Sequence, residues 1–117
     1  MSVHSKYISI LLLELESLEE DVTLLIDAYK DRKEKGEITD YVLLENLAVL
    51  KSEIHGLESF RRLLTELDPE SYEDLDSLVQ DIRSRIKSIM DGSSFPESLY
   101  PLVLRRLAKV ARFVRQV

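Results

Sequence analysis

The sequence predicts an all-α protein that folds as an antiparallel, up-down four-helix bundle. Apolar residues recur at alternating steps of three and four along most of the 117-residue chain, which is the period of an amphipathic helix. No segment shows the alternation of a half-buried strand, and five of the six glycines and prolines stand near expected helix ends. We therefore expect one domain over residues 1–117, with helices at about 6–35, 40–67, 69–91 and 98–116.

The first expected helix has an unbroken heptad seam that begins near Lys6. Gly36 follows a basic last turn, and glycine suits the left-handed position that ends many helices. Leu12 and Ile26 widen the apolar stripe, as a helix that contacts two neighbours requires. The seam consists of Ile8, Leu11, Leu15, Leu18, Val22, Leu25 and Tyr29.

The second helix is expected to begin at Thr39 or Asp40, either of which can cap it. Gly56 lies inside this helix, where it costs about 1 kcal/mol relative to alanine, and we interpret it as the site of close approach by a neighbouring helix. Arg61 falls on the seam, so Phe60 beside it is expected to occupy the core. The seam consists of Leu43, Leu47, Leu50, Ile54, Leu57 and Leu64.

The third helix is expected to start at Asp68-Pro69-Glu70, because Asp caps, Pro suits the first helical position and Glu favours the positive end of the helix dipole. Gly92 ends it, a loop follows, and the fourth helix begins near Ser98 with Pro101 in its first turn. The two seams are Tyr72, Leu75, Val79, Ile82, Ile86 and Ile89, then Leu99, Val103, Leu107, Val110, Val114 and Val117.

The first two helices should outreach the fourth, at about 42 Å against about 30 Å for a rise of about 1.5 Å per residue. The excess length can leave apolar side chains exposed at one end of the bundle. Completion of the bundle by dimerisation of two helical hairpins is therefore an alternative to a closed monomer.

Composition excludes several kinds of site. The chain has no cysteine, so disulfides, thiolate metal ligands and cysteine nucleophiles are absent. Of the two histidines, His4 lies near the start and His55 lacks the Glu-x-x-His spacing of bundle metal sites, since Ser52 stands three residues before it. We expect no enzyme activity, no metal and no cofactor. We also expect no membrane span and no signal peptide, in a cytoplasmic protein.

Charge is distributed unevenly along the chain. The total is −6, but residues 99–117 contain five cations and no acid, which gives them +5 and leaves −11 on the rest. Arg105, Lys109, Arg112 and Arg115 form one stripe on the fourth helix, with Arg106 beside it and Phe113 at its boundary with the seam. The stripe could neutralise acidic neighbouring helices, dock an acidic protein partner, or contact nucleic acid or an anionic membrane.

These observations predict a non-enzymatic adaptor or interaction protein that binds a protein partner, or itself, through helix faces. The predicted contact residues are Arg105, Arg106, Lys109, Arg112, Phe113 and Arg115. A nucleic-acid-associated regulator that uses the same face is the alternative, although the overall negative charge disfavours it.

The heptad pattern of residues 8–67, in a small acidic chain, also resembles that of the flagellar export chaperones. That resemblance implies a protein that binds helices of its partners, and it identifies no individual site residue.

Overall fold

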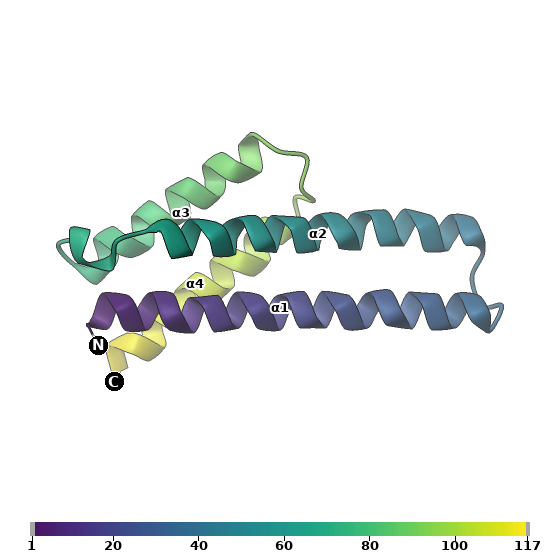
Figure 1. The fold of residues 1–117 in the computed structure, drawn as a ribbon, viewed down its shortest axis with the longest axis horizontal. Coiled ribbons are helices and arrows are strands. Elements are labelled where there is room, and N and C mark those ends of the chain that lie inside the picture. Colours follow the sequence, from purple (N-terminus) through teal and green to yellow (C-terminus); the bar gives the residue numbers. More distant parts are fainter. Residues whose placement is uncertain (1, 117) are drawn as a thin grey trace.

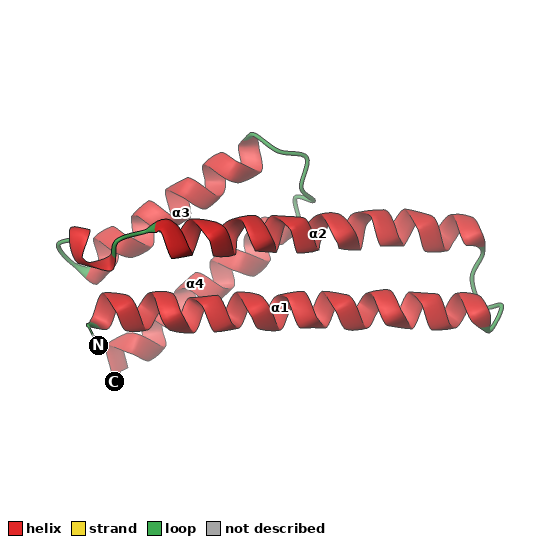
Figure 2. Ribbon diagram, viewed as in Figure 1, coloured by secondary structure: helices red, strands yellow, loops and turns green. Residues whose placement is uncertain are grey.

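The computed structural model describes residues 2–116 and confirms the all-helical prediction (Figures 1 and 2). Within these residues the regular elements are four α-helices and one short 3-10 turn, and no strand is present. The helices are α1 (Val3–Glu34), α2 (Asp40–Glu66), α3 (Leu75–Asp91) and α4 (Leu99–Gln116), and the turn η1 spans Pro69–Ser71.

Local capping sets the ends of the first two helices. Ser2 accepts a hydrogen bond from the backbone nitrogen of Ser5 at 3.1 Å, so α1 begins at Val3, three residues before the predicted start. Thr39 caps α2 through Val42 N at 3.2 Å, as expected. Gly36 has a φ of 74°, a conformation that glycine adopts without strain.

The predicted start of the third helix at position 69 is wrong. Asp68 and Pro69 initiate the 3-10 turn η1, after which Tyr72 takes an extended backbone conformation with a ψ of 135°. A second cap, Asp74, accepts a hydrogen bond from Ser77 N at 2.8 Å and starts α3 at Leu75. Tyr72 therefore lies outside the helix, and its hydroxyl donates to Asp81.

The helices form two layers. α1 and α2 run antiparallel as a long hairpin, which ion pairs fix from Lys33–Asp40 at 3.1 Å to Arg61–Glu19 at 2.5 Å. α3 and α4 form a second antiparallel pair behind this hairpin (Figure 1).

α4 crosses the hairpin diagonally rather than running along it. Its first residue, Leu99, lies against Gly56 in the middle of α2. Further along, the carbonyl of Leu107 accepts a hydrogen bond from the hydroxyl of Tyr7 on α1, at 3.1 Å. The start of α1 and the end of α4 consequently lie at the same end of the molecule (Figure 1).

All four helices contribute to one large apolar core in which Tyr7 and Phe60 are fully buried. The prediction that Phe60 rather than Arg61 occupies the core is thus confirmed. α3 faces this core through Leu78, Ile82 and Ile86, and Leu78 was not among the predicted seam residues.

Gly56 has the predicted close neighbour. A Cβ atom built at this position would overlap Leu99 Cδ2 and would lie 3.3 Å from Phe95 Cγ. The absent side chain therefore lets the start of α4 and the loop before it pack directly on the α2 backbone.

A second, smaller cluster lies at the far end of the hairpin. We call residues 20–54 the hairpin tip; there α1 and α2 extend beyond α3 and α4 to give the molecule its 55 Å length (Figure 1). Leu25, a predicted seam residue, is 50% exposed here, and Ile26 is buried in its place. The cluster comprises Val22, Ile26, Leu47 and Leu50, with Tyr29, Leu43 and Ile54 packed around it.

Candidate functional site on the outer face of α4

α4 divides into a buried and an exposed side, as its sequence predicts. Its apolar seam is buried against the other helices from Leu99 to Val114, while Val117 lies outside the described residues. Five of the predicted contact residues are exposed on the other side, and Arg106 is half-buried at the edge facing α1. The buried seam fixes the rotation of α4, which is why these residues face outward.

Two of the predicted contact residues bind α1. Arg106 donates to Glu14 Oε2 at 2.8 Å, and Lys109 donates to Glu14 Oε1 at 2.9 Å. The hydrogen bond from Lys109, with the charges of Lys109 and Arg106, lowers the pKa of the Glu14 carboxyl below its ordinary value. Glu14 is therefore ionised at neutral pH and holds α4 against α1.

A third cation binds α3, since Arg115 forms an ion pair with Asp76. Arg106, Lys109 and Arg115 thus contact acidic neighbours within the chain. For these three residues the geometry favours a role in stabilising the bundle, which was one of the interpretations of the stripe.

The remaining three predicted contact residues have no such partner. Arg105 and Arg112 are exposed, and neither forms an ion pair with any residue between 2 and 116. Phe113, which the sequence placed at the boundary of the core, is 52% exposed. These side chains are therefore free to contact another molecule.

The exposed side of α4 also carries an apolar residue that the sequence analysis did not select. Leu102 is 36% exposed and lines a shallow groove of about 430 Å³ with Arg105, Ala108 and Arg112. Leu102 stands seven residues before Lys109, so helical spacing alone could have placed it on the same face as the basic stripe. The candidate site is thus a cationic surface with an apolar residue near each end, Leu102 and Phe113.

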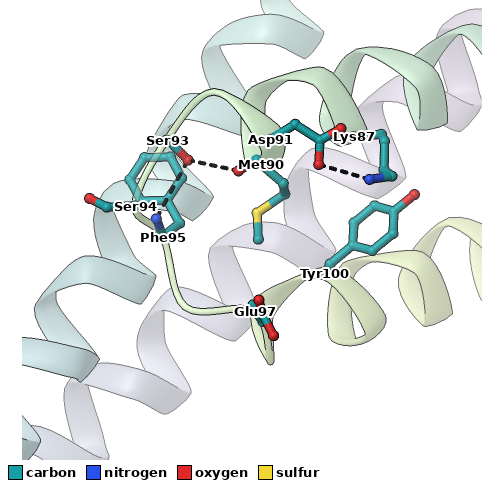
Figure 3. Close-up of a pocket in the computed structure, with 8 residues that line it drawn as sticks. All are labelled: Lys87, Met90, Asp91, Ser93, Ser94, Phe95, Glu97 and Tyr100. Atoms are coloured by element: carbon teal, nitrogen blue, oxygen red, sulfur yellow. Dashed lines mark hydrogen bonds and ion pairs between the residues drawn. The ribbon is translucent and has the colours of Figure 1, made fainter.

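A second hollow, of about 580 Å³, lies where α3 turns into α4 (Figure 3). Lys87 binds Asp91 at 2.7 Å, and Ser93 bridges the loop to Met90. Tyr100 extends below Lys87, whose ammonium lies 6.0 Å from the centre of the ring. The charged Lys87 and Asp91 side chains of this hollow thus already pair with each other along α3, and only the Lys87–Tyr100 contact crosses to α4.

Among residues 2–116, no group of three or more His, Asp or Glu side chains converges as a metal site would require. None of the described helices is long and apolar enough to cross a membrane. His55, the histidine weighed as a ligand, is exposed on α2.

No protein-family model, curated protein or solved structure matches the chain. The resemblance of residues 8–67 to the flagellar export chaperones therefore stays a prediction.

Proposed function

We propose that the protein is a non-enzymatic helical adaptor that binds an acidic protein partner through the outer face of α4. The observation that supports this most is the pair of exposed arginines, Arg105 and Arg112, which no ion pair among residues 2–116 engages. A buried seam on the other side of the helix holds both residues outward. Their charges therefore do not contribute an ion pair to the part of the fold that the structure describes.

The spacing of the site favours a helical partner. Arg105 and Arg112 are seven residues apart, so they stand about 10 Å apart along α4, two turns of helix. Acidic residues two turns apart on a partner helix would match them in pairs. Leu102 and Phe113 lie about 16 Å apart on the same side and can pack against apolar residues of that partner.

Nucleic acid fits this surface less well. Glu14 and Asp76 already form ion pairs with three of the cations on α4, and the net charge of the chain is −6. A phosphate-binding surface needs a strongly positive field and loses affinity steeply as salt rises. We therefore expect no salt-sensitive binding to a short DNA duplex in a fluorescence-anisotropy titration.

The test compares three baits in the same extract of source cells: the wild-type chain, Arg105→Glu/Arg112→Glu, and a control, Lys51→Glu/Arg62→Glu. The control makes the same change in charge at exposed positions of α2. We expect at least one protein that the wild type and the control retain and the α4 variant loses. A purified partner should regain binding to the α4 variant when its own acidic residues are changed to arginine.

Identical recovery of every protein by the three baits would contradict the proposal. Circular dichroism and thermal unfolding of each bait serve as the folding control. Both α4 substitutions lie on exposed side chains, so the variants should unfold at nearly the same temperature as the wild type.

A further inference from the structure

The second layer of the fold, α3 and α4, ends before the hairpin tip. The apolar faces of α1 and α2 that this layer covers continue into the tip. On α1, Leu11, Leu18 and Leu25 recur every seventh residue and thus lie on nearly the same face. Leu11 is fully buried and Leu18 is 7% exposed, but Leu25 is 50% exposed. The face of α1 that packs in the core is therefore uncovered in the tip.

The same holds for α2. Gly56 lies under Leu99 and Phe95, and one heptad toward the tip Val49 is 46% exposed. Val42, another heptad on, is half-buried. Both helices thus present an unpartnered apolar face on the side where α3 and α4 lie further along. We call this the tip face; by phase it contains Asp21, Leu25, Ala28 and Arg32 of α1 and Val42, Glu45, Asn46 and Val49 of α2.

The α1 half of the tip face is complementary to itself. Along the helix it runs acid, apolar, apolar, base: Asp21, Leu25, Ala28, Arg32. When two copies of this segment run antiparallel, Leu25 of one lies opposite Ala28 of the other. In that register Asp21 lies opposite Arg32, and the reverse pair forms by symmetry. All four side chains are exposed. Arg32 forms an ion pair with Glu37 at 3.4 Å within the chain, and the contact with Asp21 of the second copy would replace or share that pair.

The α2 half of the tip face is also complementary to itself, in a register that matches the register of the α1 pair. An antiparallel pair that places Val42 opposite Val49 also places Glu45 opposite Asn46, with its centre between these two residues. The α1 pair has its centre between Ile26 and Asp27. The small cluster packs Val22 and Ile26 against Leu47 and Leu50, which sets the level of the two helices in the tip and puts the two centres within about one residue, or about 1.5 Å, of each other.

We propose that the tip face binds a second copy of this chain, with the two hairpin tips antiparallel and related by one two-fold axis. The same two-fold axis relates α1 to α1 and α2 to α2 of the second copy, as a self-complementary dimer interface requires. The tip of each copy then fills the layer that α3 and α4 leave empty in the other. The two tips together form a four-helix bundle around the small clusters of Val22, Ile26, Leu47 and Leu50.

The arrangement also fits end to end. In this register position 34 of one copy is level with position 19 of the other along the helix axis, and position 40 is level with position 51, although these residues lie outside the tip face. The joining loop therefore ends just before Gly56, where Leu99 and Phe95 cover α2. The tip face shares no residue with the outer face of α4, so loss of either contact leaves the other intact.

The first test uses the absence of cysteine from the chain. Residues 42 and 49 are about 10 Å apart along α2, too far for a disulfide within one chain. We expect Val42→Cys/Val49→Cys to form a covalent dimer on mild oxidation, which a thiol reductant returns to monomers, while Val42→Cys alone and Val49→Cys alone form no covalent dimer. Crosslinking of either single variant as efficiently as the double variant would overturn the antiparallel register.

The second test is the mass in solution, measured by light scattering at micromolar concentrations. The wild-type chain should give twice its mass of 13.6 kDa. Leu25→Asp should give the monomer mass. The matched control is Leu44→Asp, because Leu44 is 65% exposed but lies on the other flank of α2, in heptad register with Lys51. It should remain dimeric.

Exchange of the two charges tests the ion pair between Asp21 of one copy and Arg32 of the other. Asp21→Arg places two arginines opposite each other and should weaken the dimer at least tenfold at low salt, whereas Asp21→Arg/Arg32→Asp should restore it. A wild-type chain that stays monomeric, with no crosslinking of Val42→Cys/Val49→Cys, would overturn the proposal. A dimer that Leu25→Asp and Asp21→Arg leave unchanged would overturn it equally.

Discussion

Glu14 of α1 accepts a hydrogen bond from Lys109 of α4 at 2.9 Å, and this contact joins residues 95 positions apart in the chain. Arg106 reaches the other oxygen of the same carboxylate. One acidic side chain thereby fixes the position of α4 along the axis of α1. It also removes two cations from the set that an outside partner could use.

Replacement of Glu14 by glutamine should lower the free energy of unfolding by about 0.5–1 kcal/mol at pH 7, the range for ion pairs near a surface. The pKa of Glu14 is lower in the folded chain than its ordinary 4.5, so this contribution is present above that value and disappears as the pH falls through the folded pKa. Urea denaturation of wild type and Glu14→Gln at pH 7 and pH 3 measures the difference. A gap of the same size at both pH values would contradict this account, and Glu20→Gln, at an exposed position, is the control.

Tyr7→Phe should destabilise the fold by about 0.5–1.5 kcal/mol, because it removes a buried hydrogen bond to the Leu107 carbonyl. Burial raises the pKa of the Tyr7 hydroxyl above its ordinary 10.0. The unfolded chain therefore loses this proton first as the pH rises, and the stabilisation fades above pH 10. The difference in unfolding free energy between the two proteins should be constant from pH 8 to about pH 10 and should shrink by pH 11. An unchanged difference at pH 11 would argue against it.

Gly56→Ala should destabilise the protein by about 1 kcal/mol, since overpacking against Leu99 outweighs the gain in helix propensity. The sign should reverse in a Leu99→Ala background. With the neighbouring side chain removed, alanine at position 56 should stabilise by up to about 1 kcal/mol. A double-mutant cycle by thermal and urea unfolding measures this coupling, and additive effects would show that the two positions are not in contact.

Asp74→Ala should destabilise α3 more than Asp68→Ala destabilises the preceding turn. Asp74 caps a 17-residue helix, whereas Asp68 caps the three residues of η1. Hydrogen bonds from Ser77 lower the pKa of Asp74, so the effect of its removal should diminish in acid. Thermal unfolding of both variants at pH 7 and pH 3 provides the comparison, and a larger effect at position 68 would refute the assignment.

Local sequence rules predicted most of the fold because most of its helices are set by their own periodicity and caps. Thr39 and Gly36 mark the turn of the hairpin through short-range hydrogen bonding and backbone conformation alone. The start of α3 was missed because two capping aspartates stand six residues apart. Between them the 3-10 turn ends at Ser71 and Tyr72 is extended, with its hydroxyl donating to Asp81 of α3, so the helix begins only after the second aspartate.

The candidate site could be predicted only in part. Helical phase correctly placed Arg105 and Arg112 on the outside of α4. It could not show that Glu14 engages Arg106 and Lys109, because that depends on the diagonal course of α4 across α1. Leu25 was misassigned for a similar reason: its heptad position is correct, but the layer that would bury it ends before the tip.

The diagonal course of α4 has a mechanical consequence. A helix anchored on α2 at Gly56 and on α1 at Tyr7 resists sliding of those two helices along each other, because sliding would have to stretch or compress it. No such diagonal spans the hairpin tip. Bending and shear of an isolated chain should therefore concentrate in the tip, between the rigid braced half and the Gly36 turn.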